Sequence, residues 1–314
     1  MQKCLKSLPG WQKKLNKVLR AFCPFGELGI GLKEGLMMAK RTWPRLKAMK
    51  KDGGKIVMIT AYDYPSAMLA EKADVDILLV GDSLGNVILG YDSTLPVTME
   101  DMLHHTKPVV RARNNALVVA DMPFGSYEVC VEEGVINALR FIKEAGADGV
   151  KLEGGANRIP LVEALVHASI PVVGHIGLTP QSFAATGAYM IQGKTTVAAK
   201  SLIDDAKALE KAGISALVLE CVPVPVATAI SRALSIPVIG IGAGNGCDGQ
   251  VLVFHDLLGI SLGKKPKFVK EYAKAGDMIT AAIRQYALEV RAGAFPDDAH
   301  SFSMTEGEDI SKLY

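Results

Sequence analysis

Residues Ile77–Asp82 read ILLVGD, a run of four aliphatic side chains that ends in a glycine and an acid. A short apolar run of this kind, with no alternation of polar and apolar positions, is typical of a parallel strand that is buried on both faces. Similar runs recur along the chain, separated by longer stretches of helical spacing. This alternation predicts a parallel sheet covered by helices.

Eight such runs are expected to form strands, near Val57–Ala61, Ile77–Val80, Ala116–Ala120, Gly149–Leu152, Pro171–Gly174, Ala216–Leu219, Val238–Ile241 and Val251–Phe254. Helical spacing fills the stretches between them, at Tyr64–Lys72, Met99–Arg113, Val131–Ala145, Ile159–Ala168, Val197–Ala212 and Val226–Leu234. Eight doubly buried strands predict an α/β fold, a single-domain (β/α)8 TIM barrel, with an open doubly wound sheet as the main alternative. A last helix, Val269–Ala292, would close the barrel or pack on a neighbouring subunit.

Charge is distributed unevenly along the 314 residues. Residues 1–51 contain 13 Lys and Arg and two acids, whereas the remaining 263 contain 22 basic and 31 acidic residues. The acidic main body gives no electrostatic reason to expect a nucleic-acid partner.

The basic start of the chain has amphipathic helical spacing, which fits either a membrane-surface helix or an appended segment outside the fold, and we expect the second. The expected parts are an extension at 1–42, the barrel at 43–302 and a tail at 303–314.

The distribution of apolar residues and cysteines also indicates where in the cell the protein is located. No apolar run reaches the ~18 to 20 residues that cross a bilayer, so stable membrane insertion is not expected. The five cysteines are scattered without a Cys-x-x-Cys pair, which fits a reducing compartment. We therefore expect a cytoplasmic protein.

Polar residues gather where predicted strands end. Six of them follow five strands: Asp82, Asp121, Lys151, Glu153, His175 and Glu220. The carboxyl ends of barrel strands are where active sites are built. A single acid in such a place is more often a helix cap or a solvated loop charge. Six converging groups instead predict a site in which a cation or a substrate compensates the carboxylates. We expect these rim charges to be exposed and to contribute little to the core.

The acids divide into two sets. Asp82, Asp121 and Glu153 offer hard oxygen ligands without His or Cys at zinc spacing, so Mg2+ is expected rather than Zn2+. Lys151 lies two residues before Glu153 and therefore projects to the same face. Glu220, on a later strand, is expected to be a separate proton acceptor.

Two further features are weaker. The loop Gly240–Gly246 is either a ligand contact or a tight structural turn, and its partial match to Gly-x-Gly-x-x-Gly is discounted because a strand follows it. Cys221 and Cys247 have no pattern for nucleophilic catalysis and are expected to be buried, inert thiols.

Ordered motifs along the chain resemble the ketopantoate hydroxymethyltransferase family. They are Ile59–Asp63 (ITAYD), Val80–Gly85 (VGDSLG), Asp92–Thr98 (DSTLPVT), Lys151–Gly155 (KLEGG), Gly174–Ser182 (GHIGLTPQS), Leu219–Pro223 (LECVP), Ile239–Gly244 (IGIGAG) and His300–Phe302 (HSF). The resemblance runs from about Trp43 to Phe302. It departs from the family at Tyr91, where the family often has His.

The resemblance implies a (β/α)8 barrel that forms a homodecamer and uses Mg2+. It implies transfer of a hydroxymethyl group from 5,10-methylenetetrahydrofolate to 3-methyl-2-oxobutanoate, giving ketopantoate in pantothenate and coenzyme A synthesis. By matching motifs, Asp82 and Asp121 hold the metal, with Glu153 completing its surroundings directly or through water. Asp82, Ser83, Asp121 and Lys151 bind the 2-oxo acid. Glu220 accepts the proton.

Two other functions compete with this one. A phosphoenolpyruvate mutase or isocitrate lyase-type enzyme would share the barrel and Mg2+ but typically carries a catalytic Cys in a Lys-Lys-Cys-Gly-His-like loop, and no such run exists here. A barrel kept only as a scaffold would be expected to lose rim acids, and none is lost.

Overall fold

The structure is a computed structural model that describes residues 40–182, 190–261, 265–308 and 310–313. The chain divides into two units, 1–39 and 40–314. The basic helix expected near the start of the chain lies outside the described residues.

Eight parallel strands close into a barrel in sequence order. They are β1 (Ile56–Thr60), β2 (Ile77–Val80), β3 (Leu117–Asp121), β4 (Gly149–Glu153), β5 (Val172–Gly177), β6 (Ala216–Glu220), β7 (Val238–Ile241) and β8 (Gly249–Leu252). Strand β8 pairs with β1, which closes the ring and leaves no sheet edge. The closed order confirms the (β/α)8 fold and excludes the open doubly wound sheet.

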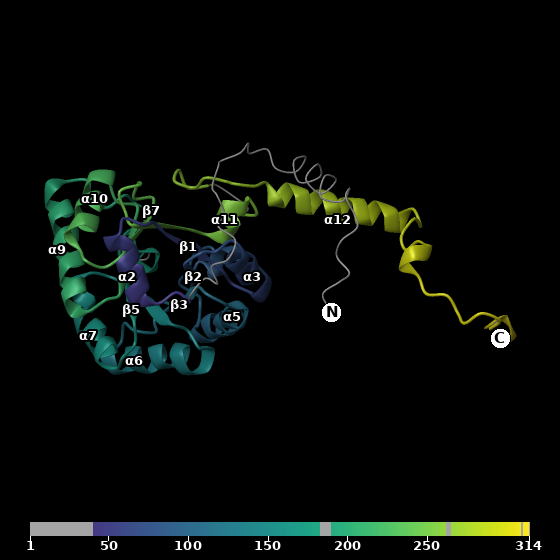
Figure 1. Ribbon diagram of the computed structural model, residues 1–314, viewed down its shortest axis with the longest axis horizontal. Coiled ribbons are helices and arrows are strands. Elements are labelled where there is room, and N and C mark those ends of the chain that lie inside the picture. Colours follow the sequence, from purple (N-terminus) through teal and green to yellow (C-terminus); the bar gives the residue numbers. More distant parts are fainter. Residues whose placement is uncertain (1–39, 183–189, 262–264, 309, 314) are drawn as a thin grey trace, which may run out of the picture. The chain divides into compact units, whose positions relative to one another are not determined.

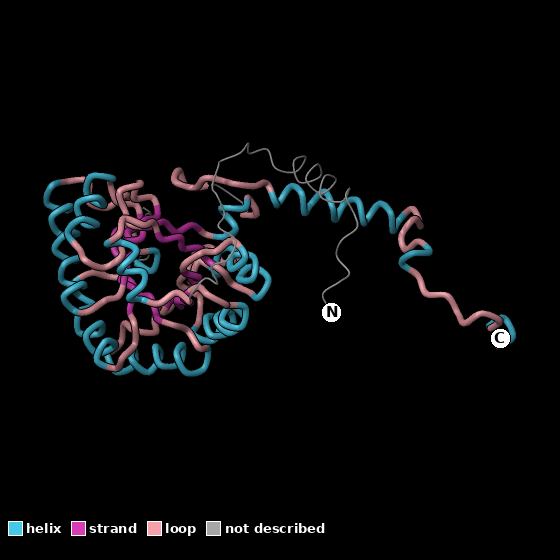
Figure 2. The backbone as a smooth tube through the Cα atoms, viewed as in Figure 1, coloured by secondary structure: helices cyan, strands magenta, loops and turns pink. Residues whose placement is uncertain are grey.

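Helices cover the outside of the strands, as Figures 1 and 2 show. Around the barrel these are α3 (Tyr64–Lys72), α5 (Met99–Ala112), α6 (Val131–Arg140), α7 (Ile159–His167), α9 (Thr196–Ala212) and α10 (Val224–Ala233), with the short helices α4 (Leu84–Val87) and α11 (Phe254–Leu258) after β2 and β8. Helix α2 (Trp43–Lys51) precedes β1, and α12 (Ala275–Arg291), which has no buried residue, extends away from the strands in Figure 1. Short 3-10 turns lie at Ala156–Arg158, Pro180–Ser182, Asp298–His300 and Ile310–Lys312. In the part of the chain that is described, no helix is long and apolar enough to cross a membrane.

Three differences from the predicted element boundaries have a local cause in the structure, and other boundaries shift by one to three residues. Helix α6 passes at Phe141 into a single π-helical turn that ends at Gly146, whose φ of 77° is left-handed. Strand β8 ends at Leu252, because Phe254 donates its main-chain N–H to Oγ1 of Thr60 and starts α11.

The third difference is at the carboxyl end of the barrel sequence. The expected helix Val269–Ala292 begins only at Ala275. Main-chain groups before and at the start of α12 bond elsewhere, since the N–H of Tyr272 donates to the carbonyl of Leu257 (2.9 Å) and that of Gly276, in the first turn, donates to the carbonyl of Gly259 (3.2 Å). These hydrogen bonds hold the segment against α11 instead of within a helix.

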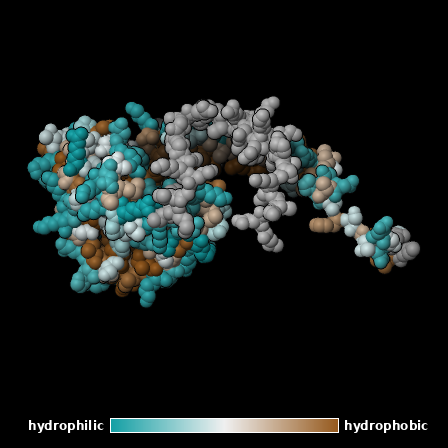
Figure 3. Space-filling model, viewed as in Figure 1, coloured by the Kyte–Doolittle hydropathy of each residue, from teal (hydrophilic) through white to brown (hydrophobic). Residues whose placement is uncertain are grey.

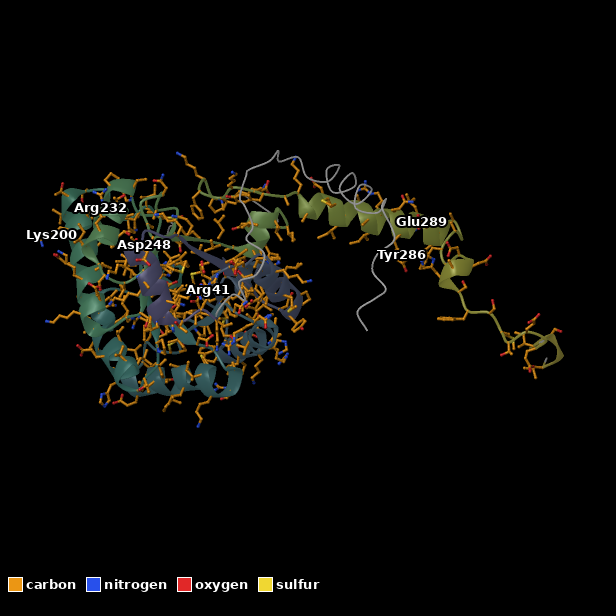
Figure 4. The ribbon with its side chains drawn as sticks, in the orientation of Figure 1. Arg41, Lys200, Arg232, Asp248, Tyr286 and Glu289 are labelled. Carbon is orange, nitrogen blue, oxygen red and sulfur yellow. The ribbon has the colours of Figure 1, made fainter. Side chains whose placement is uncertain are left out.

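The barrel has two apolar layers. Outward-facing strand residues pack under the helices, whereas inward-facing ones form a separate cluster with Leu46 of α2 at its base. Leu46 is fully buried, so α2 plugs the amino-terminal end of the barrel. Lys50 of α2 anchors it there, with Nζ 2.7 Å from Oδ2 of Asp248 (labelled in Figure 4) and 2.7 Å from the carbonyls of Ser231 and Ile236.

The folded unit begins before α2. Arg41, 5% exposed, donates from Nε to Oδ1 of Asp76 at 2.6 Å and from Nη2 to Oδ1 of Asp74 at 3.0 Å. Oδ2 of Asp76 accepts the N–H of Val57, so this ion pair ties the chain before α2 to β1. In the view of Figure 3 the barrel surface is mostly hydrophilic, as expected for the outer faces of amphipathic helices.

Candidate active site

The site is built from the inward-facing rows of β3, β4, β5 and β6, together with Asp82, which follows β2. Side chains two apart on a strand point the same way, so Asp121 continues the row of Val119, and Glu220 continues the row of Val218. His175 has the same position on β5. The interior is therefore apolar near α2 and turns polar at the carboxyl ends of the strands, where the sequence placed the candidate residues.

Five of the six candidate residues are buried, contrary to the expectation of exposed rim charges. Their exposed fractions are 2% to 4% for Asp82, Asp121, Lys151, Glu153 and His175. The side chain of Glu220 remains 16% exposed. The turn Pro180–Ser182 contributes to this burial, because Gln181 bonds to the carboxylates of Asp82 and Glu153 in place of water.

Asp121 contacts two other members of the cluster. The main-chain N–H of Asp82 donates to Oδ2 of Asp121 (3.0 Å), and Nζ of Lys151 lies 2.8 Å from Oδ1 of Asp121. The Lys151 contact is an ion pair at short distance, although Oδ1 receives no aligned hydrogen bond. Asp121 therefore links the end of β2 to the end of β4.

Burial sets the charge state of this cluster. Burial raises the pKa of Asp82 to about 8, and the charges of Asp121 and Glu153 add to the rise. Burial also raises the pKa of Asp121, against the opposing charge of Lys151. Burial alone would lower the pKa of Lys151, but the three surrounding acids outweigh it and raise that pKa. The cluster thus holds a permanent ammonium and three carboxyl groups, and a divalent cation bound there would favour their ionised form.

His175 lies between the cluster and Glu220. Its Nδ1 is 3.4 Å from Oε1 of Glu153, and its Nε2 is 3.2 Å from Oε2 of Glu220, close enough for an ion pair but not aligned as a hydrogen bond. Burial and the charge of Lys151 act to lower the pKa of His175, but the contacts with Glu153 and Glu220 outweigh them and raise it to about 9. A protonated ring donates from both nitrogens, so Nδ1 faces Glu153 as a donor, and its 3.3 Å approach to Nζ of Lys151 is a contact between two cations.

These contacts also fix the charge of Glu153. Burial acts to raise its pKa, but the contacts with His175 and Lys151 hold it below its ordinary value. Glu153 is therefore a carboxylate at neutral pH even though it is almost completely buried.

Ser83 lies on the other side of the cluster. Its hydroxyl is 2.9 Å from the hydroxyl of Tyr62, which is itself buried. A Cβ at Gly81 would come within 2.8 Å of Oγ of Ser83 and 3.5 Å of Oδ2 of Asp121. The glycine therefore allows the hydroxyl and the carboxylate to approach the same small space.

Three participants received no role from the sequence. Gln181 donates to the carboxylates of Asp82 and Glu153, Tyr127 accepts the main-chain N–H of Glu153, and Tyr62 bonds to Ser83. Tyr62 and Gln181 lie inside motifs that carry the family resemblance, so those motifs were the available signal. Tyr127 lies in a loop and outside every motif, and nothing in the sequence singled it out.

The donor set fits a hard divalent cation. Three carboxylates lie within one network, and Oδ1 of Asp121 is a buried acceptor without a hydrogen bond. Within the described ranges no three His, Cys, Asp or Glu side chains already form a metal cage. Mg2+ needs no such cage, because it is commonly held by one or two carboxylates together with water and substrate oxygens.

The glycine loop has a structural explanation. Gly242 and Gly244 have left-handed φ values of 63° and 78°. A Cβ at Gly242 would meet the ring of Phe268 at 2.8 Å, and one at Gly244 would meet Val224 at 2.5 Å. The glycines are thus required by the turn and its packing, and β8 follows the loop, which agrees with discounting the dinucleotide motif.

Cys221 and Cys247 were expected to be buried, inert thiols, and the structure confirms the burial of Cys247 only. Burial raises the pKa of Cys221 and of Cys247 to about 11 in each case. Cys247 is buried, whereas Cys221 is only partly buried. Both are therefore thiols, not thiolates, at neutral pH.

Comparison with known proteins agrees with the motifs. The family model described as ketopantoate hydroxymethyltransferase matches residues 40–298. The chain is 57% identical to the 3-methyl-2-oxobutanoate hydroxymethyltransferase of Heliobacterium modesticaldum over 270 residues, which cover 86% of this chain and 98% of that protein. It is also 57% identical to the enzyme of the same name from Moorella thermoacetica, over 84% of this chain and 100% of the relative.

Solved structures show a more distant likeness of fold. A phosphonopyruvate hydrolase complexed with oxalate and Mg++ has a TM-score of 0.54 at 14% identity, covering 85% of this chain and 93% of that chain. A phosphoenolpyruvate phosphomutase from Streptomyces platensis subsp. rosaceus has a TM-score of 0.53 at 17% identity, covering 81% and 88%. The likeness to the lyase-type enzymes is therefore a likeness of the barrel fold alone.

Proposed function

Because this chain belongs to the ketopantoate hydroxymethyltransferase family, we propose that it transfers a hydroxymethyl group from 5,10-methylenetetrahydrofolate to 3-methyl-2-oxobutanoate. The products are 2-dehydropantoate (ketopantoate) and tetrahydrofolate, in the pantothenate and coenzyme A pathway. The observation that carries this proposal is the position of Glu220, a partly exposed acid beside a buried cluster of three carboxylates and one lysine.

The cluster supplies the ligands for Mg2+. We assign Asp82 and Asp121 to the ion, with Glu153 completing its surroundings directly or through water. Bound there, Mg2+ would draw electron density from the 2-oxo group and so make the proton on the adjacent carbon more acidic. The buried setting strengthens this electrostatic effect, because water is largely excluded from the acids.

The 2-oxo acid is bound by residues on either side of the cluster. Asp82 and Asp121 reach it through the ion, and Ser83 offers a hydroxyl whose position is held by Tyr62. Lys151 keeps its positive charge because the surrounding acids raise its pKa. It therefore provides a fixed ammonium for the oxygens of an anionic substrate.

Glu220 accepts the proton from C3 of 3-methyl-2-oxobutanoate. The electron pair left on C3 forms a new bond to the methylene carbon that the folate carries. One of the two bonds between that carbon and the folate nitrogens breaks as the C–C bond forms, and the oxygen of one water replaces the second, so the carbon becomes a hydroxymethyl group. The two nitrogens take up the proton removed from C3 and one proton of the water, and ketopantoate and tetrahydrofolate leave. His175 holds Glu220 in place through the 3.2 Å contact.

Assembly as a homodecamer is part of the proposal. Helix α12 has no buried residue, and apolar side chains lie exposed along it at Ile279, Ile283, Tyr286 and Val290 (Tyr286 is labelled in Figure 4). Apolar stripes of this kind normally pack against another surface. Light scattering should therefore give the mass of ten chains of 33.4 kDa.

The proposed location is the cytoplasm. The described cysteines Cys130, Cys221 and Cys247 are all free, as in a reducing compartment.

The direct test is an assay with purified protein. Ketopantoate should form from 3-methyl-2-oxobutanoate, 5,10-methylenetetrahydrofolate and Mg2+, and omission of any one of the three should stop the reaction. Ketopantoate formation that continues after chelation of all divalent ions would contradict the metal assignment. Cleavage of a 2-oxo acid without folate would favour the lyase instead.

A further inference from the structure

The side chain of Gln181 has no part in the proposed reaction, yet it lies buried among the acids at 4% exposure. Its Nε2 donates to Oδ2 of Asp82 at 2.8 Å and to the carbonyl of Met122 at 2.9 Å. Both amide hydrogens are therefore used. A carbonyl oxygen can only accept, so the contact with Met122 fixes which end of the amide faces Asp82.

The other end of the amide is held by Tyr127. The tyrosine oxygen accepts the main-chain N–H of Glu153 at 3.1 Å, and its hydroxyl donates to Oε1 of Gln181. The ring of Tyr127 is held in turn by Arg158, whose guanidinium lies 4.8 Å from the ring centroid and donates to the carbonyl of Glu153 at 3.2 Å. Tyr127 thus has one orientation, and it gives Gln181 one orientation.

The backbone of Gln181 contacts a second acid. Its main-chain N–H donates to Oε2 of Glu153 at 3.0 Å. One residue therefore holds one oxygen of Asp82 through its side chain and one oxygen of Glu153 through its backbone. The second oxygen of each acid, Oδ1 and Oε1, is left for other partners.

We infer that Gln181 is a positioning residue, which fixes the carboxylates of Asp82 and Glu153 for the cation and is itself locked by Tyr127. This inference rests on the proposed function, because it takes the two acids as ligands. Groups that orient metal ligands typically contribute about 10- to 100-fold to metal affinity. Removing the Gln181 amide should therefore weaken metal binding even when no substrate is present.

The test measures binding of Mn2+, a spectroscopic substitute for Mg2+, to the full-length chain without substrates. Free Mn2+ is followed by electron paramagnetic resonance. Gln181→Met keeps the length of the side chain but removes the amide, and we expect about a 10- to 100-fold rise in Kd. Tyr127→Phe keeps the ring and its contact with Arg158, and we expect a smaller rise. In the double variant the Tyr127 change should raise Kd by a smaller factor than it does in the wild-type background, because the hydroxyl acts on Asp82 through Gln181 and only its hydrogen bond to the main-chain N–H of Glu153 remains to be lost.

The matched control is Thr106→Val, which removes another fully buried polar group. Thr106 bonds to the carbonyl of Met102 within α5 and contacts none of the acids. It should leave the Mn2+ affinity unchanged, while thermal melts show which variants are folded at the assay temperature.

Wild-type Mn2+ affinity in folded Gln181→Met would overturn the inference. If Gln181→Met does not fold, the Mn2+ affinity of Tyr127→Phe is the test instead. An unchanged Mn2+ affinity in Tyr127→Phe would then overturn the inference. Asp82→Asn separates this failure from that of the proposed function. Weak binding in Asp82→Asn with normal binding in Gln181→Met removes only the positioning role, whereas normal binding in both removes the metal assignment itself.

Discussion

Nε2 of His175 lies 3.2 Å from Oε2 of Glu220, and Nδ1 of the same ring lies 3.4 Å from Oε1 of Glu153. One buried imidazolium therefore connects the proposed base to the proposed metal site. This contact keeps Glu220 next to the cluster while its side chain stays partly open to the barrel mouth.

Replacing His175 by Gln should change the pH dependence of stability. The raised pKa of about 9 means that the folded protein binds the His175 proton more tightly than the unfolded chain, whose histidines titrate near 6.5. The stabilising contribution is thus fully present below about pH 6.5 and is lost as the pH rises through about 9. It should be on the order of 3 kcal/mol. Urea unfolding of metal-free protein should show a gap between wild type and His175→Gln at pH 6 that narrows by pH 9.5. A gap that does not change with pH would contradict a protonated ring.

Isosteric changes of two buried acids should differ in their effect on stability. Asp82 has a pKa of about 8 and is largely uncharged at pH 7 without metal. Asp82→Asn should therefore change the free energy of unfolding by less than about 1 kcal/mol, since Asn also accepts from Gln181. Asp121→Asn leaves the charge of Lys151 with a weaker partner and should cost about 3 kcal/mol.

Both variants should lose Mg2+ and 2-oxo acid affinity together, because the ion is proposed to bridge protein and substrate. Calorimetric titration checks this expectation beside the unfolding curves. Undiminished Mg2+ affinity in both would show that these carboxylates are not ligands, and equal stability losses would show that their charge states are alike.

Much of the site could be predicted from where the strands end. The rule that barrel active sites form at the carboxyl ends of the strands placed Asp82, Asp121, Lys151, Glu153, His175 and Glu220 together, and the structure has them at these ends. The regular alternation of strands and helices likewise gave the barrel. Burial of the acids could not be predicted, because it depends on the turn that carries Gln181.

Loop contacts have no periodicity to read. Tyr127 reaches Gln181 across 54 residues of sequence, and only the folded loops bring them together. The late start of α12 has the same cause, since hydrogen bonds to Leu257 and Gly259 compete with helix formation. The charge states of the buried site residues could not be predicted from the sequence, since each depends on neighbours from other strands.

Changes at the base of the barrel should affect stability without affecting catalysis. Leu46 is fully buried in the interior cluster at the end opposite the acids. Leu46→Ala should cost about 2–5 kcal/mol of unfolding free energy, through lost burial and the cavity that remains. The KM for 3-methyl-2-oxobutanoate should stay within about twofold of wild type at a temperature where the variant is folded. A large change in KM would show that the plug influences the mouth.

The thiols should differ in reactivity. Cys130 is exposed, whereas the pKa of Cys221 and that of Cys247 are both raised to about 11 by burial. Only thiolates react with iodoacetamide, so at pH 8 Cys130 should be alkylated first and the other two slowly. Raising the pH toward 11 should accelerate Cys221. Peptide mapping by mass spectrometry follows each cysteine separately, and rapid modification of Cys247 at pH 8 in folded protein would be inconsistent with its burial.

The role of Glu220 is tested most directly by hydrogen exchange at C3 of 3-methyl-2-oxobutanoate in deuterated water, a partial reaction that needs no folate. Glu220→Gln keeps the size of the side chain and removes the proton acceptor. Loss of a general base slows proton transfer by about 10²- to 10⁴-fold. We predict that Glu220→Gln binds Mg2+ and the 2-oxo acid as wild type does, while its exchange rate, followed by NMR, falls by that factor. Exchange at the wild-type rate would contradict the assignment and would make His175 the next candidate for the base, in which case its ring would have to be neutral.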